Sequence, residues 1–466
     1  MKKKISILWA ILYIMLSLYP NINVVYAKGE DTIDLENTEE LEICVEENEY
    51  DQGKIKKAIE EYQKLYPNVN IIIRKLPYAG YAEGEVLRKA EVTKIKTEIM
   101  SGEGSDLFLL HSGRSYVCGN TDNLFEDLEK TARTGVFENL SVIFEGENAI
   151  DSEEYYEFAL EAGRVEGKQI FLPLSFNFRG CLTSEKNLKD SRFDCDKAEK
   201  SMQMFHEEIL KCFNKQERAD LGISYYKNMS SPVIDYHTGK IHIGKKEKQY
   251  FEWSKEEYLL SKEYKQDTFI SDKYDQEVAR NIITGKTKMQ GGILETEPLG
   301  IMLSAQIMAK EGEKPIFIKI PDENGKTVAN IKGYAAVNKN SKNKKNAFNF
   351  IKLLLSEQMQ IEGAYPSSES FPIKKGKDVI KKIIDKKCQE DSLNNVEVNS
   401  LTDITMDSIM NIVNDIETAH IQEIYEIPLE GSKRYSDYLM EYMENEMTYE
   451  EFSEVVTDKL KFYLEE

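Results

Sequence analysis

The sequence predicts an α/β protein with two large lobes, and three observations support this class. Residues 41–76 contain a strand-like run, a polar loop, an amphipathic helix and a second strand-like run. This order predicts parallel strands joined by a right-handed crossover. The composition is globular, since 41% of the residues are hydrophobic and the chain has 26 Tyr and 19 Phe. Its 466 residues are enough to bury two separate cores.

The first 27 residues have the features of a secretory signal peptide. Lysines occupy positions 2–4, residues 5–19 carry no charge, and a Val-Tyr-Ala sequence ending at Ala27 suits a signal peptidase. The apolar run is shorter than the roughly 20 residues that a membrane-spanning helix needs. We expect export and cleavage after Ala27, and an uncleaved N-terminal anchor is the alternative. Residues 28–39 are polar and acidic, which predicts a flexible lead-in.

The charge excludes two classes of partner. The net charge is −21, and removal of the leader makes it more negative because the leader carries three lysines and no acid. A strongly acidic protein is a poor partner for nucleic acid and for anionic lipid.

The cysteines lie far apart and do not have the spacing of a zinc site. They are Cys44, Cys118, Cys181, Cys195, Cys212 and Cys388, and both disulfides and buried free thiols remain open.

The first elements follow from periodicity. Residues 41–45 alternate apolar and polar positions as a strand does, and a polar loop follows. The next segment has one apolar helical face and ends at Pro67; that face is formed by Ile55, Ala58, Ile59, Tyr62 and Leu65. Residues 68–76 form a β-branched run, which predicts a buried strand.

The pattern then repeats, and the chain later becomes more helical. Val92, Ile95 and Ile99 predict a helix that ends at Gly102, and SDLFLL at 105–110 predicts the next strand. In open α/β sheets, ligands bind outside the carboxyl ends of the strands, which draws interest to the loops at 46–50 and 111–115. Residues 341–360 predict one amphipathic helix. Residues 448–466 predict a final helix that begins with a capping box.

Several segments together resemble a known family, the extracellular solute-binding proteins of ABC importers, in particular the large sugar-binding type (family 1-like). The matching segments occur in the family's order: EEYQKLYPNVNI, TEIMSGEGSDLFLL, GKQIFLPLSFNFRGCLTSEKNL, DYHTGKIHIGKKEKQYFEWSKEEY, KMQGGILETEP, IPDENGKTVANIKGYAAVNKNSKNKKNAFNFIKLLLSEQMQ and MTYEEFSEVVTDKLKFYLEE. Each motif alone is weak, and their order over most of the chain makes the resemblance specific.

The resemblance implies a two-lobed periplasmic-binding-protein-like (type II) fold with a hinge and a ligand cleft between the lobes. Lobe 1 would comprise residues 40–172 and about 290–340, and lobe 2 would comprise residues 173–289 and about 341–466. It also implies a monomer that captures a small solute, with a carbohydrate as the expected class, and delivers it to an ABC permease without cofactor or catalysis. A secreted glycan-acting enzyme and a ligand-binding subunit of a membrane sensor are the alternatives.

Two departures from the family pattern affect these expectations. Many relatives carry a lipid-modified cysteine directly after the leader, and this chain has none there, so we expect an extracellular or cell-surface protein without a lipid tether. Sugar-binding relatives often carry a tryptophan in the segment that matches KMQGGILETEP, where this chain has Leu294 and Glu295. A peptide, a cationic solute or a modified glycan therefore stays open. We expect Trp253, which lies in a helical stretch, to be a core residue.

The candidate ligand-binding residues come from loop position and from the resemblance. A carboxylate at Glu46 could bind hydroxyls or a cation, and a guanidinium at Arg114 could bind a carboxylate or a diol. Residues 175–179 match the lobe crossover, where alternation places either the aromatic or the polar side chains on the cleft side. The full set is Glu46, Asn48, His111, Arg114, Ser175, Phe176, Asn177, Arg179, Glu295 and Tyr334. His237 and His242 have poor metal-ligand spacing, and no nucleophile or phosphate-loop motif occurs.

Overall fold

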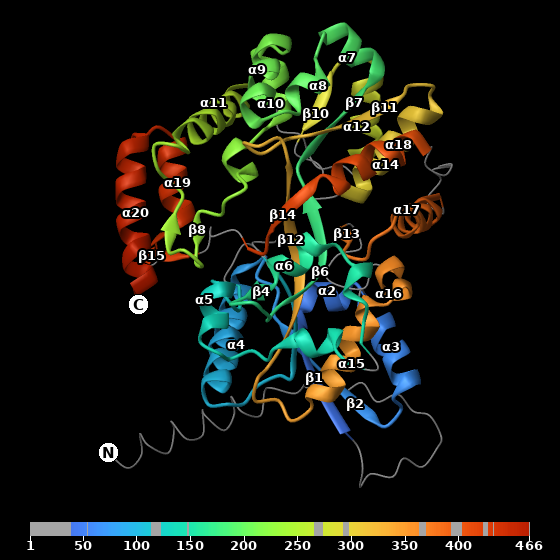
Figure 1. Cartoon of the computed structure of the whole chain (residues 1–466), viewed down its shortest axis with the longest axis vertical. Helices are drawn as coiled ribbons and strands as arrows, with labels where there is room; N and C mark the ends of the chain where they lie inside the picture. Colours follow the sequence, from blue (N-terminus) through green and yellow to red (C-terminus); the bar gives the residue numbers. More distant parts are fainter. Residues whose placement is uncertain are drawn as a thin grey trace, which may run out of the picture.

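The computed structural model describes residues 39–53, 55–112, 123–146, 149–264, 274–291, 298–362, 370–392, 403–422, 427–431 and 433–465. Two lobes lie one above the other, with a further group of helices at one side (Figure 1). The predicted leader lies outside the described residues. Glu39, expected as the last residue of the lead-in, begins the first strand.

The first lobe is built on the larger sheet, with strand order β13-β6-β12-β3-β1-β2 and β14 beside β12. β1 pairs in parallel with β2 and β3, which confirms the predicted strand–helix–strand unit. The strands are β1 (Glu39–Glu46), β2 (Val69–Leu76), β3 (Leu107–His111), β6 (Leu172–Phe178), β12 (Thr327–Val337), β13 (Phe371–Pro372) and β14 (Ile416–His420).

Helices cover both faces of this sheet because the side chains of each strand alternate between faces. Ile43 of β1 packs in one core with α3 (Lys56–Leu65), α6 (Glu157–Ala162) and α15 (Lys344–Leu355). Its neighbour Cys44 packs in a second core with α4 (Ala82–Met100) and α5 (Leu128–Arg133). Burial raises the pKa of the Cys44 thiol, so this cysteine behaves as a small apolar core residue.

The second lobe contains a smaller sheet with strand order β10-β7-β11. Its strands are β7 (Gly180–Ser184), β10 (Met289–Gly291) and β11 (Pro315–Lys319). One face packs against α9 (Met202–Cys212) and α10 (Lys215–Leu221). The other packs against α12 (Tyr274–Ile283), α14 (Pro298–Lys310) and α18 (Asp403–Asn414), and belongs to the same continuous cluster of buried side chains as Ile43.

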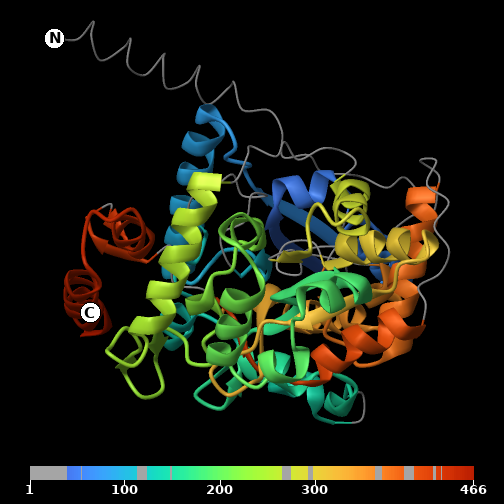
Figure 2. The same ribbon diagram turned by 90° about the horizontal axis from the view of Figure 1, so that it is seen from above.

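A C-terminal module has its own core of Phe251, Tyr442, Phe452, Val456 and Leu460. It consists of α11 (Lys248–Tyr264), α19 (Tyr435–Met443), α20 (Tyr449–Glu465), the hairpin β8 (Ile234–Asp235)–β9 (Lys240–Ile241) and the hairpin β15 (Pro428–Glu430)–β16 (Lys433–Arg434). Seen from above, α19 and α20 lie to one side of the two sheets (Figure 2). The predicted final helix is confirmed, since the Thr448 and Glu451 side chains each bond to the other residue's backbone N–H.

The chain crosses from the first lobe to the second at Arg179, between β6 and β7, and returns between β11 and β12. It returns a second time at Asp415, between α18 and β14, where Lys319 Nζ lies 2.5 Å from Asp415 Oδ2. β11 pairs with β7 and so belongs to the second lobe, whereas α15 packs in the same core as Ile43 of β1 and so belongs to the first. These contacts differ from the expected division, in which 290–340 lay in lobe 1 and 341–466 in lobe 2.

Two predicted elements differ in detail. The loop expected at 46–50 contains a short helix, α2 (Glu47–Asp51). The single helix expected at 341–360 is divided at Ser356, whose ψ of 148° leaves the helical region, into α15 and α16 (Glu357–Glu362). The remaining helices and strands include α7 (Glu185–Ser191), α8 (Cys195–Ala198), α17 (Lys377–Ser392), β4 (Arg164–Val165) and β5 (Lys168–Gln169).

Candidate functional site

One edge of the larger sheet faces the second lobe. β1 and β3 are parallel, and β12 is antiparallel to both β3 and β6, so β6 runs in the same direction as β1 and β3. The carboxyl ends of these three strands, at Glu46, His111 and Phe178, therefore lie at the same edge. β7 of the second lobe begins only one residue beyond β6. This edge is where the sequence predicted ligand contacts.

Glu46 is held by an arginine from α4. The Glu46 side chain is 4% exposed and that of Arg88 is 1% exposed. Arg88 Nη1 lies 2.7 Å from Oε2 and Nη2 lies 3.0 Å from Oε1, so the guanidinium bonds both carboxylate oxygens. Arg88 Nη1 also donates to Pro77 O at 3.1 Å. The pair ties α4 to the end of β1, and a ligand would have to share oxygen atoms that already accept bonds.

The next residues form one turn of helix beside the end of β3. Asn48 is half-buried, and its Oδ1 accepts from Gln52 Nε2 at 3.2 Å, so its side chain reaches the surface. Glu49 Oε1 lies 3.2 Å from His111 Nε2, and these side chains are only 1% and 8% exposed. His111, a predicted site residue, is thereby linked to the α2 segment that contains Asn48.

The packing of β6 shows which of the two faces predicted for residues 175–179 lies in the core. Phe176 and Phe178 pack against Phe371 with ring centroids 5.7 and 5.1 Å apart, so the aromatic face is core. Ser175 and Asn177 lie on the opposite face, at 5% and 0% exposure. The polar face is therefore the one that remains a candidate for ligand contact, and Phe176 is fully buried among aromatic rings.

Two side chains at the crossing bond to the second lobe. Arg179 Nη1 donates to Lys227 O at 2.6 Å. His420 Nε2, at the end of β14, lies 3.0 Å from Met229 O and donates to it. Both bonds hold residues 227–229, at the end of the short 3₁₀ turn at Tyr225–Asn228, against the strands that join the lobes.

The other predicted residues divide between core and undescribed segments. Tyr334 is 2% exposed and packs edge-on against Phe171 at 5.2 Å, inside the α4-side core. Arg114 and Glu295 lie outside the described residues. Trp253, expected as a core residue, is partly buried and packs against the second-lobe core, where it stacks on His206 at 4.2 Å. Burial lowers the pKa of His206 to about 4.

Two tyrosines at the site were not predicted from the sequence. Tyr78 and Tyr81 follow β2 and form an edge-to-face pair at 6.1 Å, and Tyr81 is 57% exposed. A Cβ at Gly80 would lie 2.3 Å from the Tyr78 ring, and one at Gly84 would lie 2.1 Å from Tyr78 O. The two glycines therefore let Tyr78 fold back closely. The signal in the sequence was the Tyr-Ala-Gly-Tyr run directly after a predicted strand.

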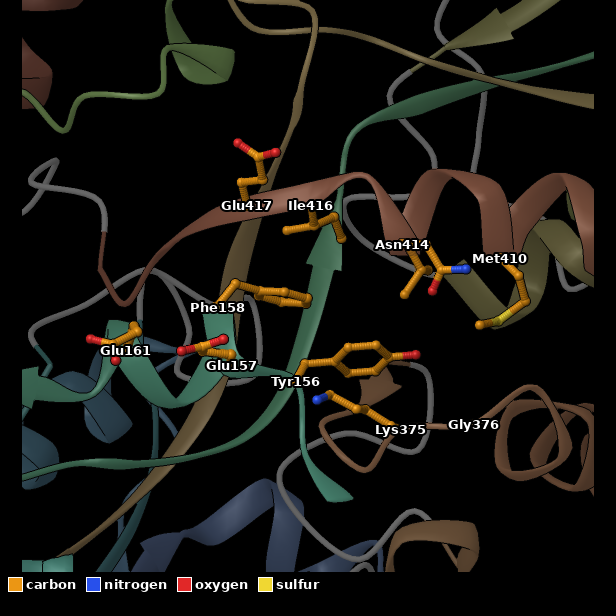
Figure 3. Close-up of a pocket in the computed structure, with 11 residues that line it drawn as sticks. Tyr156, Glu157, Phe158, Glu161, Lys375, Gly376, Met410, Asn414, Ile416 and Glu417 are labelled. Atoms are coloured by element: carbon orange, nitrogen blue, oxygen red, sulfur yellow. The ribbon is translucent and has the colours of Figure 1, made fainter. Parts of the chain in front are cut away.

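A pocket of about 560 Å³ lies between α6 of the first lobe and the α18–β14 segment. Figure 3 shows Tyr156 and Phe158 on one side and Met410, Asn414 and Ile416 on the other. Its polar groups include Glu157, Glu161, Glu417 and Lys375. Tyr156 and Phe158 belong to the same core as Ile43 and Phe176. The pocket therefore lies on the side of the sheet to which Phe176 and Phe178 point, and the polar face of β6 is turned away from it.

The described ranges contain no group of three or more His, Cys, Asp or Glu side chains placed to hold a metal ion. In the same ranges, no helix has both the length and the apolar character to cross a membrane.

Comparisons with known proteins identify the fold. No protein-family model and no curated protein sequence matches this chain. An ABC substrate-binding protein from Listeria monocytogenes in complex with cycloalternan superposes with a TM-score of 0.57 at 11% identity, over 92% of this chain and 99% of that one. The sugar-binding protein MalE from Xanthomonas citri gives 0.56 at 11% identity, over 91% and 97%. An extracellular solute-binding protein family 1 member from Alicyclobacillus acidocaldarius gives 0.55 at 13% identity, over 92% and 99%.

These matches extend over nearly the whole length of each protein, at identities that show the fold alone. The chain has the two-lobed α/β fold of the solute-binding proteins, which confirms the fold class that the sequence resemblance predicted.

Proposed function

We propose that this protein is an exported solute-binding protein that captures a carbohydrate between its lobes and delivers it to an ABC-type permease. The observation that carries the proposal is the architecture. Two lobes joined by several chain crossings share their fold, over 91–92% of the chain, with proteins described as substrate-binding or sugar-binding. Such a fold can close on a ligand, and the ligand shifts the equilibrium by its higher affinity for the closed state.

The side chains at the carboxyl edge suit a carbohydrate. Tyr81 presents an exposed ring, and an aromatic face can stack on the apolar face of a sugar. Asn48 of α2, which follows β1, supplies a half-buried polar group at this edge, and the Glu49–His111 pair links α2 to the end of β3. The net charge of −21 adds no reason to expect an anionic ligand. The Listeria protein binds cycloalternan and another protein of this fold is described with α-D-tagatose, so the fold accommodates sugars of different size.

Localisation and partner follow from the leader and from the fold. The predicted signal peptide would place the protein outside the cytoplasm, where the lack of a cysteine after Ala27 leaves it without a lipid tether. There it would act as a monomer that presents its closed form to a membrane permease. No catalytic step belongs to this proposal.

The test is binding without turnover. Full-length protein, expressed in a host that exports it, is titrated calorimetrically with maltotriose, mannotriose, xylotriose and cycloalternan, and each mixture is then analysed for products. We expect one glycan class to bind and to be recovered intact. A ligand at 100 times its Kd should stabilise the fold by about 2.7 kcal/mol, which a thermal scan measures independently. Product formation would replace the proposal with a glycan-acting enzyme.

A matched pair of variants locates the binding surface. Tyr81→Ala should lower glycan affinity about tenfold, because it removes the stacking face from a ring that contributes little to the core. Val142→Ala changes another exposed apolar side chain, which is 45% exposed in the turn at Leu140–Phe144, and should bind as the wild type does. Equal affinity of the two variants would place the ligand elsewhere.

A further inference from the structure

Three polar side chains form a row across the strands that join the lobes. Asn330 of β12 pairs in register with Asn177 of β6 on one side and with His420 of β14 on the other. Side chains of directly paired residues point to the same face of a sheet. The row therefore lies on the face opposite Phe176 and Phe178, which are packed in the core.

Asn330 is the buried centre of this row. It is 7% exposed, and neither its Oδ1 nor its Nδ2 has a hydrogen-bond partner in the described parts of the chain. It lies just past the end of β3, where Ser112 donates through its hydroxyl to Ile331 O and through its amide to Lys332 O. Beyond that point β14 replaces β3 as the neighbour of β12. The carboxamide thus lies where the carboxyl edge of the first lobe meets the crossing strands.

The second lobe brings another amide toward this row. Arg179, two residues after Asn177, bonds to the carbonyl of Lys227, and His420, the β14 partner of Asn330, bonds to the carbonyl of Met229. Asn228, between these carbonyls, is 1% exposed, and its Oδ1 has no partner in the described ranges. Ser175, two residues before Asn177 on the same face, also has a buried hydroxyl without a described partner. Buried polar atoms without described partners therefore occur on both sides of the crossing, at Ser175 and Asn330 on the strands and at Asn228 in the turn that Arg179 and His420 hold.

The chemistry of these atoms restricts what can satisfy them. A carboxamide that lacks partners at both ends needs one group that donates to Oδ1 and one that accepts from Nδ2. Neighbouring hydroxyls of a sugar ring do both, since each can donate and accept. A carboxylate or a phosphate can only accept, and an ammonium group can only donate. Arg179 and His420 already bond to carbonyl oxygens, so these bonds direct their polar groups toward the second lobe's backbone.

We propose that Asn330 is a ligand-binding residue that holds a pair of neighbouring hydroxyls at the crossing of the lobes. This inference rests on the proposed function and specifies one subsite of it. Buried polar groups without partners destabilise a fold, and a ligand that satisfies them gains binding free energy and specificity. Because Asn228 comes from the second lobe, the subsite is complete only when the lobes are in the relative position described here.

The test compares two buried polar residues of the same strand. Asn330→Leu removes the carboxamide, and Thr327→Val removes a hydroxyl that is also buried and without a described partner. Thr327 is three residues away and lies on the opposite face of β12. Both variants should unfold at or above the wild-type temperature without ligand, because each removes an unsatisfied polar group. Only Asn330→Leu should lose affinity, by about tenfold or more, for the tightest of the four glycans named above.

A second variant keeps the shape of the side chain. Asn330→Asp retains the acceptor and loses the donor, so it should also bind the glycan more weakly, and it should unfold at a lower temperature because it buries a carboxylate without a partner. Monodeoxy analogues of the glycan add an independent readout. Deletion of the hydroxyl that contacts Asn330 should weaken wild-type binding and leave Asn330→Leu almost unaffected.

The outcomes separate the inference from the function it rests on. If the wild type binds a glycan and Asn330→Leu and Asn330→Asp bind it equally well, the subsite is wrong and the solute-binding proposal stands. If Thr327→Val loses as much affinity as Asn330→Leu, the effect is a general property of the strand, which also overturns the subsite. If the wild type binds none of the glycans, the carbohydrate proposal fails and the subsite fails with it.

Discussion

The first lobe meets the rest of the molecule through two regions of opposite chemistry. One, the apolar seam, consists of Tyr156 and Phe158 at the start of α6 together with Met410, Val413 and Ile416 of the α18–β14 segment, and borders the pocket in Figure 3. The other, the tyrosine clasp, joins α5 of the first lobe to the C-terminal module through Asp127, Lys130, Tyr236 and Tyr463. The seam is an extension of the core, and the clasp is a set of directed polar bonds.

The clasp is centred on one carboxylate. Asp127 caps α5 by accepting from Lys130 N at 2.8 Å through Oδ1. Its Oδ2 accepts from the Tyr236 hydroxyl and, at 3.1 Å, from that of Tyr463. Lys130 Nζ donates to Tyr463 O at 2.7 Å and lies 3.7 Å from the centre of the Tyr463 ring. Few atoms are involved, and each bond depends on direction.

The difference separates stability from the choice of conformation. Burial of apolar surface is non-directional, so the seam can keep the lobes together while they shift relative to one another. Hydrogen bonds weaken steeply with angle, so the clasp favours one position of the C-terminal module relative to the first lobe. We therefore expect damage to the seam to lower the free energy of unfolding. Damage to the clasp should move the C-terminal module away from the first lobe at a smaller cost in stability.

The largest effect should come from the seam. Phe158→Ala removes a ring that is 7% exposed and packs 5.0 Å from Phe176 and 5.2 Å from Tyr156. Urea denaturation should show a loss of about 3–5 kcal/mol, which is typical of a large aromatic core truncation. A loss below about 1 kcal/mol would mean that the seam is not a structural core.

A smaller effect in stability and a larger one in shape should follow from breaking the clasp. Tyr236→Phe and Tyr463→Phe should each cost about 1 kcal/mol. The double variant should cost more than the sum, since Asp127 Oδ2 then loses both donors. Small-angle scattering of the ligand-free double variant should give a larger radius of gyration. Tyr438→Phe removes a hydroxyl bond to Glu430 inside the C-terminal module and should leave the radius unchanged.

The clasp also has a pH signature. Burial raises the pKa of Asp127 above its usual 3.8, although bonds from Lys130 N and Tyr463 oppose the shift. The folded state then binds this proton more tightly than the unfolded state, so the contribution of Asp127 to stability falls as pH rises above 3.8. Asp127→Asn, which can still cap α5, should gain stability relative to the wild type between acidic and neutral pH. Denaturation midpoints of both proteins, measured across that pH range, test this. A difference between variant and wild type that does not change with pH would contradict it.

The smallest effect should come from a surface pair beside the seam. Glu161 and Arg164 form an ion pair three residues apart, with side chains that are 50% and 41% exposed. Glu161→Gln should change the free energy of unfolding by less than about 1 kcal/mol, as solvent-exposed ion pairs do. A change as large as that of Phe158→Ala would show that the acidic rim of the pocket, and not its apolar wall, holds the seam together.

Local patterns in the sequence were enough to predict several elements of this fold. The parallel β1–β2 pair, the helix that ends before Pro67 and the capping box at Thr448 each depend on residues that are neighbours along the chain. The sequence placed β11 in the first lobe and α15 in the second, and the structure has the reverse. Local patterns could not predict this, because packing partners far apart in sequence decide it.

The candidate site shows the same limit at the level of side chains. Alternation along β6 placed Phe176 and Asn177 on opposite faces, and only the packing of Phe371 decided that the aromatic face is core. Position after a strand identified Glu46, and a partner 42 residues away, Arg88, determines what its carboxylate does. Asn330 attracted no attention in the sequence because its significance lies in register with two distant strands.

The sequence by itself therefore determined the fold class, the order of its elements and the stretches of chain from which the candidate site is built. These depend on periodicity and turn chemistry, which act over a few residues. The tertiary structure alone decided which polar groups are paired and which are left buried without partners, and which surfaces of the lobes meet. Those outcomes depend on contacts between segments up to several hundred residues apart, such as Asp127 with Tyr463, and no local pattern encodes them.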